Sequence, residues 1–223
     1  MTTGFRICAR TWTSRQDLLD RFRGIPVANI SDVMGRMNAA AALRPYHDGT
    51  PLCGQALTIK ARPGDNLMVH KALRIAQPGD VLMVDAGGDL TNAIVGEFMV
   101  AEAVERGVAG LVIDGAVRDL ASIRRQSLPV YAAGITHRGP YKDGPGEIHV
   151  AVAVGGMAVR PGDIVVGDED GVLAVPLDQA QSVLEAALAK QAAERAQWES
   201  VRAGTRDYSW IDDTLRKKGC VFE

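Results

Sequence analysis

The stretch DAGGDLTNAIVGEFMVAEAVERGVAGLVIDGAVRD, residues 85–119, decides the fold of this 223-residue chain. The stretch begins at the end of an apolar strand predicted at 81–85, and its first part is expected to be a glycine-rich loop. Apolar residues at helical spacing predict a helix over about 96–106, and a second apolar strand is predicted at 109–114. A strand, a helix and another strand in this order indicate a parallel pair. The sequence therefore predicts an α/β fold.

Both loops of this unit are expected at the carboxyl edge of the sheet, where ligands usually bind in open α/β folds. The first loop carries Glu97 and the N–H groups at the helix start, and a Gly-Ala turn after the second strand leads to Arg118 and Asp119. An adjacent Arg and Asp can also be a helix cap beside a surface cation. The small residues before the pair leave a cleft open and favour a site for a small anion and a metal ion.

Composition and charge narrow the function classes. The formal net charge of -2 gives no basic excess for nucleic-acid binding. The cysteines at 8, 53 and 220 are widely spaced and form no CxxC motif, which indicates reduced thiols in a cytoplasmic protein. The N-terminus has no apolar core of a signal peptide, and no apolar run approaches the ~18 residues of a membrane span. We expect a cytoplasmic protein without nucleic-acid or membrane partners.

The remaining pattern predicts a body at 1–176 and a helical extension at 177–223. Predicted helices lie at 13–23, 29–37 with Ser31 as a candidate cap, 70–76, 120–126, 179–201 capped by Asp178, and 210–217; predicted strands lie at 56–61, 128–131, 148–154, 164–166 and 172–175; residues 134–147 are expected to be a loop. Pro-Gly-Asp occurs three times, and type II turns explain all three copies. The polar helical extension is expected to pack on a neighbouring subunit.

The choice of metal and cofactor follows from which ligands the chain offers. One carboxylate with water suits Mg²⁺ or Mn²⁺. The four histidines lack zinc-ligand spacing and are interpreted as structural or surface residues. The glycine loop is not GxGxxG, so no dinucleotide is expected. Glu97 could hold a water molecule near the metal, or it could simply favour the positive end of its helix.

Several motifs together carry a family resemblance. They are NISDVMGR at 29–36, QPGDVLMVDAGG at 77–88, GLVIDGAVRD at 110–119 and RPGDIVVGDEDGVLAVP at 160–176. The chain resembles the RraA-like family, which includes the class II, metal-dependent 4-hydroxy-4-methyl-2-oxoglutarate / 4-carboxy-4-hydroxy-2-oxoadipate aldolases. Their signature is an acidic residue, twenty intervening residues and then Arg-Asp. Glu97, residues 98–117 and Arg118-Asp119 match this spacing, with Glu in place of the usual Asp.

The resemblance implies a swivelling β/β/α domain with appended C-terminal helices, assembled as a trimer or a dimer of trimers. It implies cleavage of a 4-hydroxy-2-oxo diacid to pyruvate and a 2-oxo acid through a metal-stabilised pyruvate enolate, with oxaloacetate decarboxylase activity besides. Asp119 would be the metal ligand, and Arg118 would donate to the developing oxyanion. The substrate carboxylate would bind the N–H groups of Gly96, Glu97, Phe98 and Met99. Glu97 would also hold a water that carries the proton.

The resemblance also implies that a neighbouring subunit supplies a residue to each active site, and it offers an alternative function. A glutamate of a neighbour's C-terminal helix would complete the site, and the alignment places it at Glu194, with Glu199 one turn away as the alternative. Glu194 could equally be a surface residue paired with Lys190. Other members resemble a non-catalytic regulator that inhibits the endoribonuclease RNase E. Those regulators are shorter, lack the appended C-terminal helices and have lost the metal carboxylate. Because this chain has both the helices and the carboxylate, catalysis is favoured.

Overall fold

The computed structural model describes residues 4–222 and divides into two compact units, one that ends at Ala187 and one that begins at Leu188. The boundary falls inside a long helix, later than the predicted boundary between residues 176 and 177. The first turns of this helix bury Val183 and Leu184 in the core of the first unit, so they belong to that unit. Within the described residues, no helix is long and apolar enough to cross a membrane.

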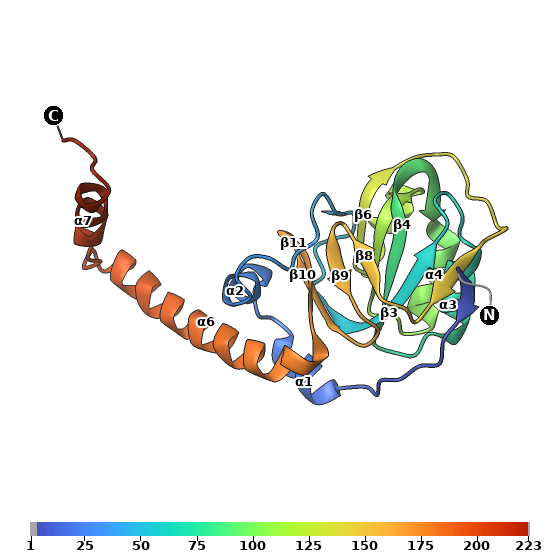
Figure 1. Cartoon of the computed structure of the whole chain (residues 1–223), viewed down its shortest axis with the longest axis horizontal. Helices are drawn as coiled ribbons and strands as arrows, with labels where there is room; N and C mark the ends of the chain where they lie inside the picture. Colours follow the sequence, from blue (N-terminus) through green and yellow to red (C-terminus); the bar gives the residue numbers. More distant parts are fainter. Residues whose placement is uncertain (1–3, 223) are drawn as a thin grey trace. The chain divides into compact units, whose positions relative to one another are not determined.

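The elements of the chain are labelled in Figure 1. They are β1 (Phe5–Ile7), α1 (Gln16–Phe22), α2 (Val27–Val33), β2 (Arg44–Pro45), β3 (Leu52–Ala61), α3 (Leu67–Ile75), β4 (Asp80–Val95), α4 (Glu97–Glu105), β5 (Gly110–Val117), α5 (Leu120–Ile123), β6 (Val130–Ile135), β7 (Gly146–Ile148), β8 (Val152–Val154), β9 (Met157–Val159), β10 (Ile164–Asp168), β11 (Gly171–Val175), the short 3₁₀ helix η1 (Leu177–Gln179), α6 (Ala180–Arg202) and α7 (Ser209–Lys217).

The first unit is built on a sheet with the strand order β1-β7-β3-β4-β5-β6-β2, and β10 adds to β3 and pairs with β11. Strands β3, β4, β5 and β6 are mutually parallel, which confirms the predicted parallel pair. Parallel strands covered on both faces are continuously apolar. The paired segments 80–84 of β4 and 110–113 of β5 accordingly show uninterrupted burial.

Alternate residues of the parallel strands enter two separate cores. Leu82 and Val84 pack with helices α3 and α4, whereas Val81 and Met83 pack with the hairpins β8–β9 and β10–β11 and with α1 and α2. Figure 1 shows helices α3 and α4 on one side of the sheet and the β8–β9 hairpin on the other. A hairpin layer, a central sheet and a helical layer form the β/β/α arrangement, and the predicted α/β fold is confirmed.

The glycine-rich loop expected after residue 85 is part of a strand instead. Strand β4 continues to Val95 and β5 to Val117, so the Gly-Ala turn predicted at 115–116 is also strand. Residues 85–95 of β4 lie opposite residues 114–117 of β5, and the register shifts at three points. Gly87 and Gly88 both have φ of 69°, which allows the backbone to bulge away and return to the ladder.

Two predicted helix caps are wrong. Ser31 lies inside α2, which begins after Pro26, and Asp178 lies in η1 ahead of α6. Proline is common at a helix start because its fixed φ suits the first turn, and this signal was the stronger one for α2. Strands β1, β2 and β9 were not predicted because two or three residues carry too little periodicity.

The three Pro-Gly-Asp segments are turns, as predicted. Gly64, Gly79 and Gly162 have φ of 74°, 87° and 88°, the positive values that a type II turn requires. In each turn the aspartate N–H donates to the carbonyl three residues earlier, at 3.0 to 3.2 Å.

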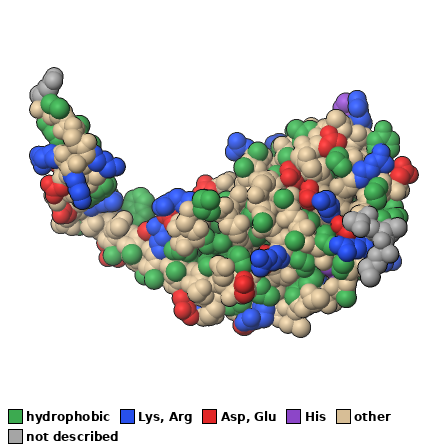
Figure 2. All heavy atoms as spheres, viewed as in Figure 1, with side chains coloured by type: hydrophobic (Ala, Val, Ile, Leu, Met, Phe, Trp, Pro, Cys, Tyr) green, Lys and Arg blue, Asp and Glu red, His purple; other side chains and the backbone are tan. Residues whose placement is uncertain are grey.

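Charged groups are interspersed over the face drawn in Figure 2, in keeping with the small net charge.

Candidate active site

The strand ends bring the predicted site residues together. Arg118 and Asp119 directly follow β5, Gly96 directly follows β4, and the Arg118 N–H donates to the Val95 carbonyl at 3.0 Å. Asp119 has φ of 61°, a left-handed conformation that is uncommon outside glycine. This backbone conformation ends the strand abruptly at the carboxyl edge of the sheet.

Gly96 is required by the close approach of the Arg-Asp pair. A Cβ atom at this position would lie 2.5 Å from Asp119 Oδ2 and 2.9 Å from Arg118 Nε. Gly139 adjoins the guanidinium in a similar way, since a Cβ there would lie 3.1 Å from an Arg118 terminal nitrogen. Two glycines therefore make room for the Arg118 side chain. Sequence reasoning identified Gly96 but missed Gly139, which lies in the predicted loop.

The Asp119 carboxylate also organises the start of α4. Its Oδ2 accepts a hydrogen bond from the Glu97 N–H at 3.0 Å and lies 3.6 Å from Arg118 Nε. No donor within the described residues reaches Oδ1, and the side chain is 36% exposed. One oxygen is thus held by the protein while the other faces outward. Asp119 acts as a distant cap for α4, in addition to any role as a ligand.

The expected cradle of N–H groups is narrower than predicted. The Glu97 N–H is taken by Asp119, and the Met99 N–H donates to the Gly96 carbonyl at 3.1 Å. The Phe98 N–H has no acceptor within the helix, because the first turn of a helix supplies none. Phe98 is therefore the clearest backbone donor for a carboxylate, and its side chain is 80% exposed.

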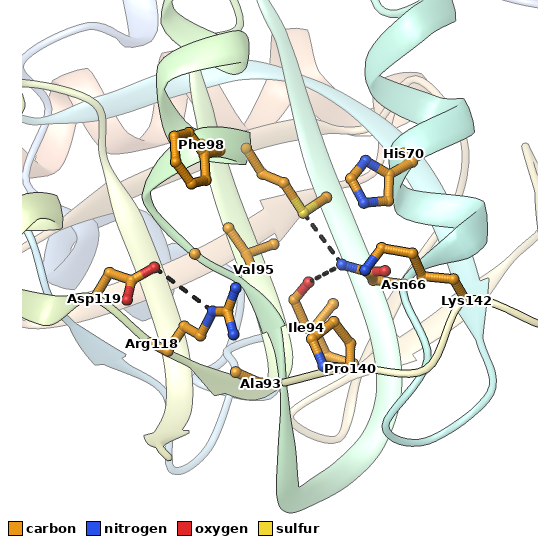
Figure 3. Close-up of a pocket in the computed structure, with 12 residues that line it drawn as sticks. Asn66, His70, Ala93, Ile94, Val95, Phe98, Arg118, Asp119, Pro140 and Lys142 are labelled. Carbon is orange, nitrogen blue, oxygen red and sulfur yellow. Dashed lines mark hydrogen bonds and ion pairs between the residues drawn. The ribbon is translucent and has the colours of Figure 1, made fainter. Parts of the chain in front are cut away.

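These groups line one pocket of about 150 Å³ at the carboxyl edge. Figure 3 shows Arg118 and Asp119 on one side of the end of β4, and Asn66, His70 and Lys142 on the other. The full lining is Asn66, His70, Ala93, Ile94, Val95, Gly96, Phe98, Met99, Arg118, Asp119, Pro140 and Lys142. Glu97 is not among these lining residues, although its neighbours Gly96 and Phe98 are.

The wall opposite the Arg-Asp pair was not predicted. The sequence predicts His70 to be a structural or surface residue and indicates no role for Asn66 or Lys142. The sequence feature that marks this wall is the first Pro-Gly-Asp turn, which contains Asp65. The Asp65 carboxylate accepts hydrogen bonds from the N–H groups of Asp143 and Gly144, at 2.7 and 2.9 Å. Because Asp65 directly precedes Asn66, these bonds hold the loop that carries Lys142 next to Asn66.

The electrostatics of this wall favour an anionic ligand. Burial lowers the pKa of His70 below its ordinary value, and the Lys142 ammonium lowers it further, with a smaller opposing effect of Glu102. His70 is therefore neutral at neutral pH, and the positive charges of the pocket are those of Arg118 and Lys142. Asp119 is the one acidic side chain among the lining residues. These three charges leave the pocket side chains with one net positive charge, which favours an anionic ligand.

Within residues 4–222, no group of three or more His, Cys, Asp or Glu side chains could hold a metal ion. Any ion at Asp119 would therefore take most of its ligands from water and substrate, as Mg²⁺ commonly does.

The predicted glutamates lie in the second unit, where every described residue is at least partly exposed. Glu194 pairs with Lys190 at 3.2 Å, which is the surface pairing considered from the sequence. Glu199 borders an open depression together with Arg195, Trp198 and Arg202. The expected role of either glutamate at a neighbour's site stays a prediction.

Comparison with known proteins identifies the family. The RraA-like family, described as Aldolase/RraA, matches residues 27–174. A Halalkalibacterium halodurans protein provisionally named a 4-hydroxy-4-methyl-2-oxoglutarate aldolase is 41% identical over 81% of this chain and 86% of its own length. A Thermus thermophilus protein that carries this name without reservation is 40% identical over 50% of this chain and 68% of its own length.

A solved structure extends the comparison to the fold. The RNA-processing inhibitor RraA from Thermus thermophilus superposes with a TM-score of 0.63 and 32% identity, over 68% of this chain and 92% of that protein. The relatives therefore include both named aldolases and a named inhibitor. On the extent of the family match and the identity to its members, this chain belongs to the RraA-like family.

Proposed function

We propose that this protein is a divalent-metal-dependent lyase that cleaves a 4-hydroxy-2-oxo diacid to pyruvate and a second 2-oxo acid. The observation that carries the proposal is the meeting of Arg118, Asp119 and the start of α4 around Gly96 in a single pocket. The names of the aldolase relatives support it. The same chemistry would release pyruvate from oxaloacetate by decarboxylation.

The Asp119 carboxylate fits a hard divalent cation. Its Oδ2 is engaged by the Glu97 N–H, and its Oδ1 has no donor within the part of the chain described. Mg²⁺ and Mn²⁺ accept a single carboxylate when water and substrate fill the other positions. When bound there, such an ion would polarise the keto group of the substrate and stabilise the charge of the enolate.

Arg118 is suited to stabilise negative charge on the substrate. Its guanidinium lies between Gly96 and Gly139 and borders the pocket. It would donate to the keto oxygen as that oxygen gains charge, a contact that strengthens towards the transition state. The Phe98 N–H, at the positive end of α4, would hold the carboxylate beside the keto group.

The bond changes of the cleavage assign a task to each group. The C4 hydroxyl loses its proton, the C3–C4 bond breaks as the C4 carbonyl forms, and the bonding electrons pass to the pyruvate enolate. The enolate then takes a proton at C3. Glu97 is half-buried at the helix start beside Asp119, and we assign it the water through which protons move.

A subunit arrangement belongs to the proposal. We propose a trimer or a dimer of trimers in which Glu194 of a neighbouring copy supplies a carboxylate to each pocket. The second unit exposes large apolar side chains that an assembly would cover, among them Trp198, Trp210 and Phe222.

The proposal is tested by measuring pyruvate. Purified protein with Mg²⁺ or Mn²⁺ is given 4-hydroxy-4-methyl-2-oxoglutarate, 4-carboxy-4-hydroxy-2-oxoadipate or oxaloacetate, and pyruvate is followed with a coupled lactate dehydrogenase assay. We expect release from at least one of the two 4-hydroxy-2-oxo acids and from oxaloacetate. Absence of release from all three substrates with both ions would contradict the proposal.

The second candidate function is inhibition of an endoribonuclease, which the similarity to the RNA-processing inhibitor favours. A regulator would release no pyruvate from any of these substrates. It would also bind its partner equally well as wild type and as Asp119→Ala, because a binding surface does not require an open carboxylate.

A further inference from the structure

Asn66 holds an unusual place in the pocket wall. It directly precedes α3, is only 3% exposed and lines the pocket opposite Arg118. Its Nδ2 donates to the Ile94 carbonyl at 2.9 Å and contacts Met99 Sδ at 3.3 Å. Because a carbonyl oxygen only accepts hydrogen bonds, the contact with Ile94 fixes which end of the carboxamide is the amino group. The orientation of Oδ1 is thereby fixed as well.

The Asn66 Oδ1 atom is buried and has no hydrogen-bond partner within the described residues. An asparagine before a helix usually turns this oxygen to an N–H of the first helical turn. Here no such cap bond forms, and Asp65 accepts the Leu67 N–H at 2.9 Å instead. Buried polar atoms are almost always paired, so this oxygen has an open acceptor position that a bound water or a ligand donor would fill.

The chemistry of that donor is restricted. Oδ1 only accepts, so the ligand must bring an O–H or N–H group. The 2-oxo acid half of the proposed substrate offers only acceptors, and these suit Arg118 and the Phe98 N–H. The C4 hydroxyl is the donor that a 4-hydroxy-2-oxo diacid adds. Oxaloacetate in its keto form has no such hydroxyl.

We infer that Asn66 Oδ1 accepts a hydrogen bond from the C4 hydroxyl of the aldol substrate, so that Asn66 selects hydroxylated diacids over oxaloacetate. This inference rests on the proposed lyase function. An amide is not a base at neutral pH, so Asn66 positions the hydroxyl oxygen and the proton leaves to another acceptor. The residue thus touches the substrate and sets specificity without taking part in proton transfer.

The test compares two substrates on one protein preparation. Asn66→Ala and wild type are assayed with 4-hydroxy-4-methyl-2-oxoglutarate and with oxaloacetate. The readout is the kcat/KM for 4-hydroxy-4-methyl-2-oxoglutarate divided by the kcat/KM for oxaloacetate. Losing one hydrogen bond to the hydroxyl should lower this ratio about tenfold. Misfolding would lower both activities together and leave the ratio unchanged. Asn66→Ser, which also removes the carboxamide oxygen, should give the same fall if the alanine variant does not fold.

Asn92→Ala is the matched control. Asn92 is also a buried asparagine whose amino group donates to a backbone carbonyl, that of Gly139, but it does not line the pocket. Its substitution should leave the ratio at the wild-type value. An equal loss of both activities in an Asn66 variant that keeps the wild-type melting temperature would overturn the inference while leaving the proposed lyase activity in place. Absence of pyruvate from both substrates with wild-type protein would overturn the proposed function, and this inference with it.

Discussion

The aspartates of the Pro-Gly-Asp turns and the aspartate at the end of β5 occupy opposite kinds of environment. Asp65, Asp80 and Asp163 are 2%, 1% and 5% exposed, and both oxygens of each accept hydrogen bonds from the protein. Asp119 is 36% exposed and offers one oxygen to solvent. With both oxygens bonded within the protein and almost no exposed surface, these three carboxylates are not open to a ligand.

The difference shows how to separate structural from functional aspartates in this fold. The turn aspartates hold segments together: Asp80, for example, binds the Arg10 guanidinium through two bonds of 2.8 and 2.9 Å and the Gln77 N–H at 2.8 Å. Among the described residues, Asp119 accepts from one backbone N–H, that of Glu97. Substitution of a turn aspartate should therefore reduce stability, and substitution of Asp119 should reduce activity.

Asp119→Asn should give the largest effect. The amide oxygen can still accept the Glu97 N–H, so α4 keeps its cap, but the charge that attracts a divalent cation is lost. We expect pyruvate release to fall by about three orders of magnitude or more, about 4 kcal/mol, with an unchanged melting temperature. Activity above a tenth of wild type in this variant would mean that Asp119 is no ligand.

Asp80→Ala should act on stability alone. It leaves the Arg10 guanidinium, which is 19% exposed, without its partner, and breaking such a pair costs about 3 kcal/mol or more. Urea unfolding should show this loss while turnover per folded molecule stays the same. Asp17→Ala is the control, since Asp17 pairs with Arg15 at the surface and its loss should leave the unfolding midpoint unchanged. A similar midpoint for the two variants would contradict the structural role of Asp80.

Arg118→Lys should lower turnover by two orders of magnitude, about 2.7 kcal/mol, the usual cost of losing an oxyanion donor. Lysine keeps the charge but not the planar fork, and its ammonium cannot occupy the space between Gly96 and Gly139 in the same way. Steady-state kinetics with oxaloacetate measure the change. Near-wild-type turnover would make Arg118 a surface cation that only partners Asp119.

Recovery of activity by mixing subunits should be the smallest signal. Arg118→Ala and Glu194→Ala are each expected to be nearly inactive. After joint unfolding and reassembly, about a quarter of interfaces would combine an intact Arg118 with an intact Glu194. Assays of the mixture should then show partial recovery. No recovery would place both residues in one chain's site, and full activity of Glu194→Ala would direct attention to Glu199.

Much of the fold was readable because its decisive signals are local. The apolar runs of β4 and β5 and the amphipathic helix between them specify a parallel pair. The bulged extension of β4 was not readable, since Gly87 and Gly88 resemble a loop until the partner strand is known. Pairing with β5, a long-range interaction, keeps these residues in the sheet.

The candidate site was readable on one side only. Arg118, Asp119 and Gly96 stand next to strand ends, where topology alone brings them together. Asn66 and Lys142 meet them through the loop that Asp65 anchors, and no periodicity reports such a tertiary contact. The sequence also does not show that the Glu97 N–H donates to the Asp119 carboxylate and the Met99 N–H to the Gly96 carbonyl, because both contacts depend on the folded structure.

Metal removal tests the catalytic role of the Asp119 pocket most directly. Wild-type protein is stripped with EDTA, its metal content is verified, and pyruvate release from oxaloacetate is measured before and after addition of Mg²⁺ or Mn²⁺. We predict no release from the stripped protein and restored release with either ion, with no restoration in Asp119→Asn. Undiminished pyruvate release from verified metal-free protein would contradict a divalent ion held at Asp119.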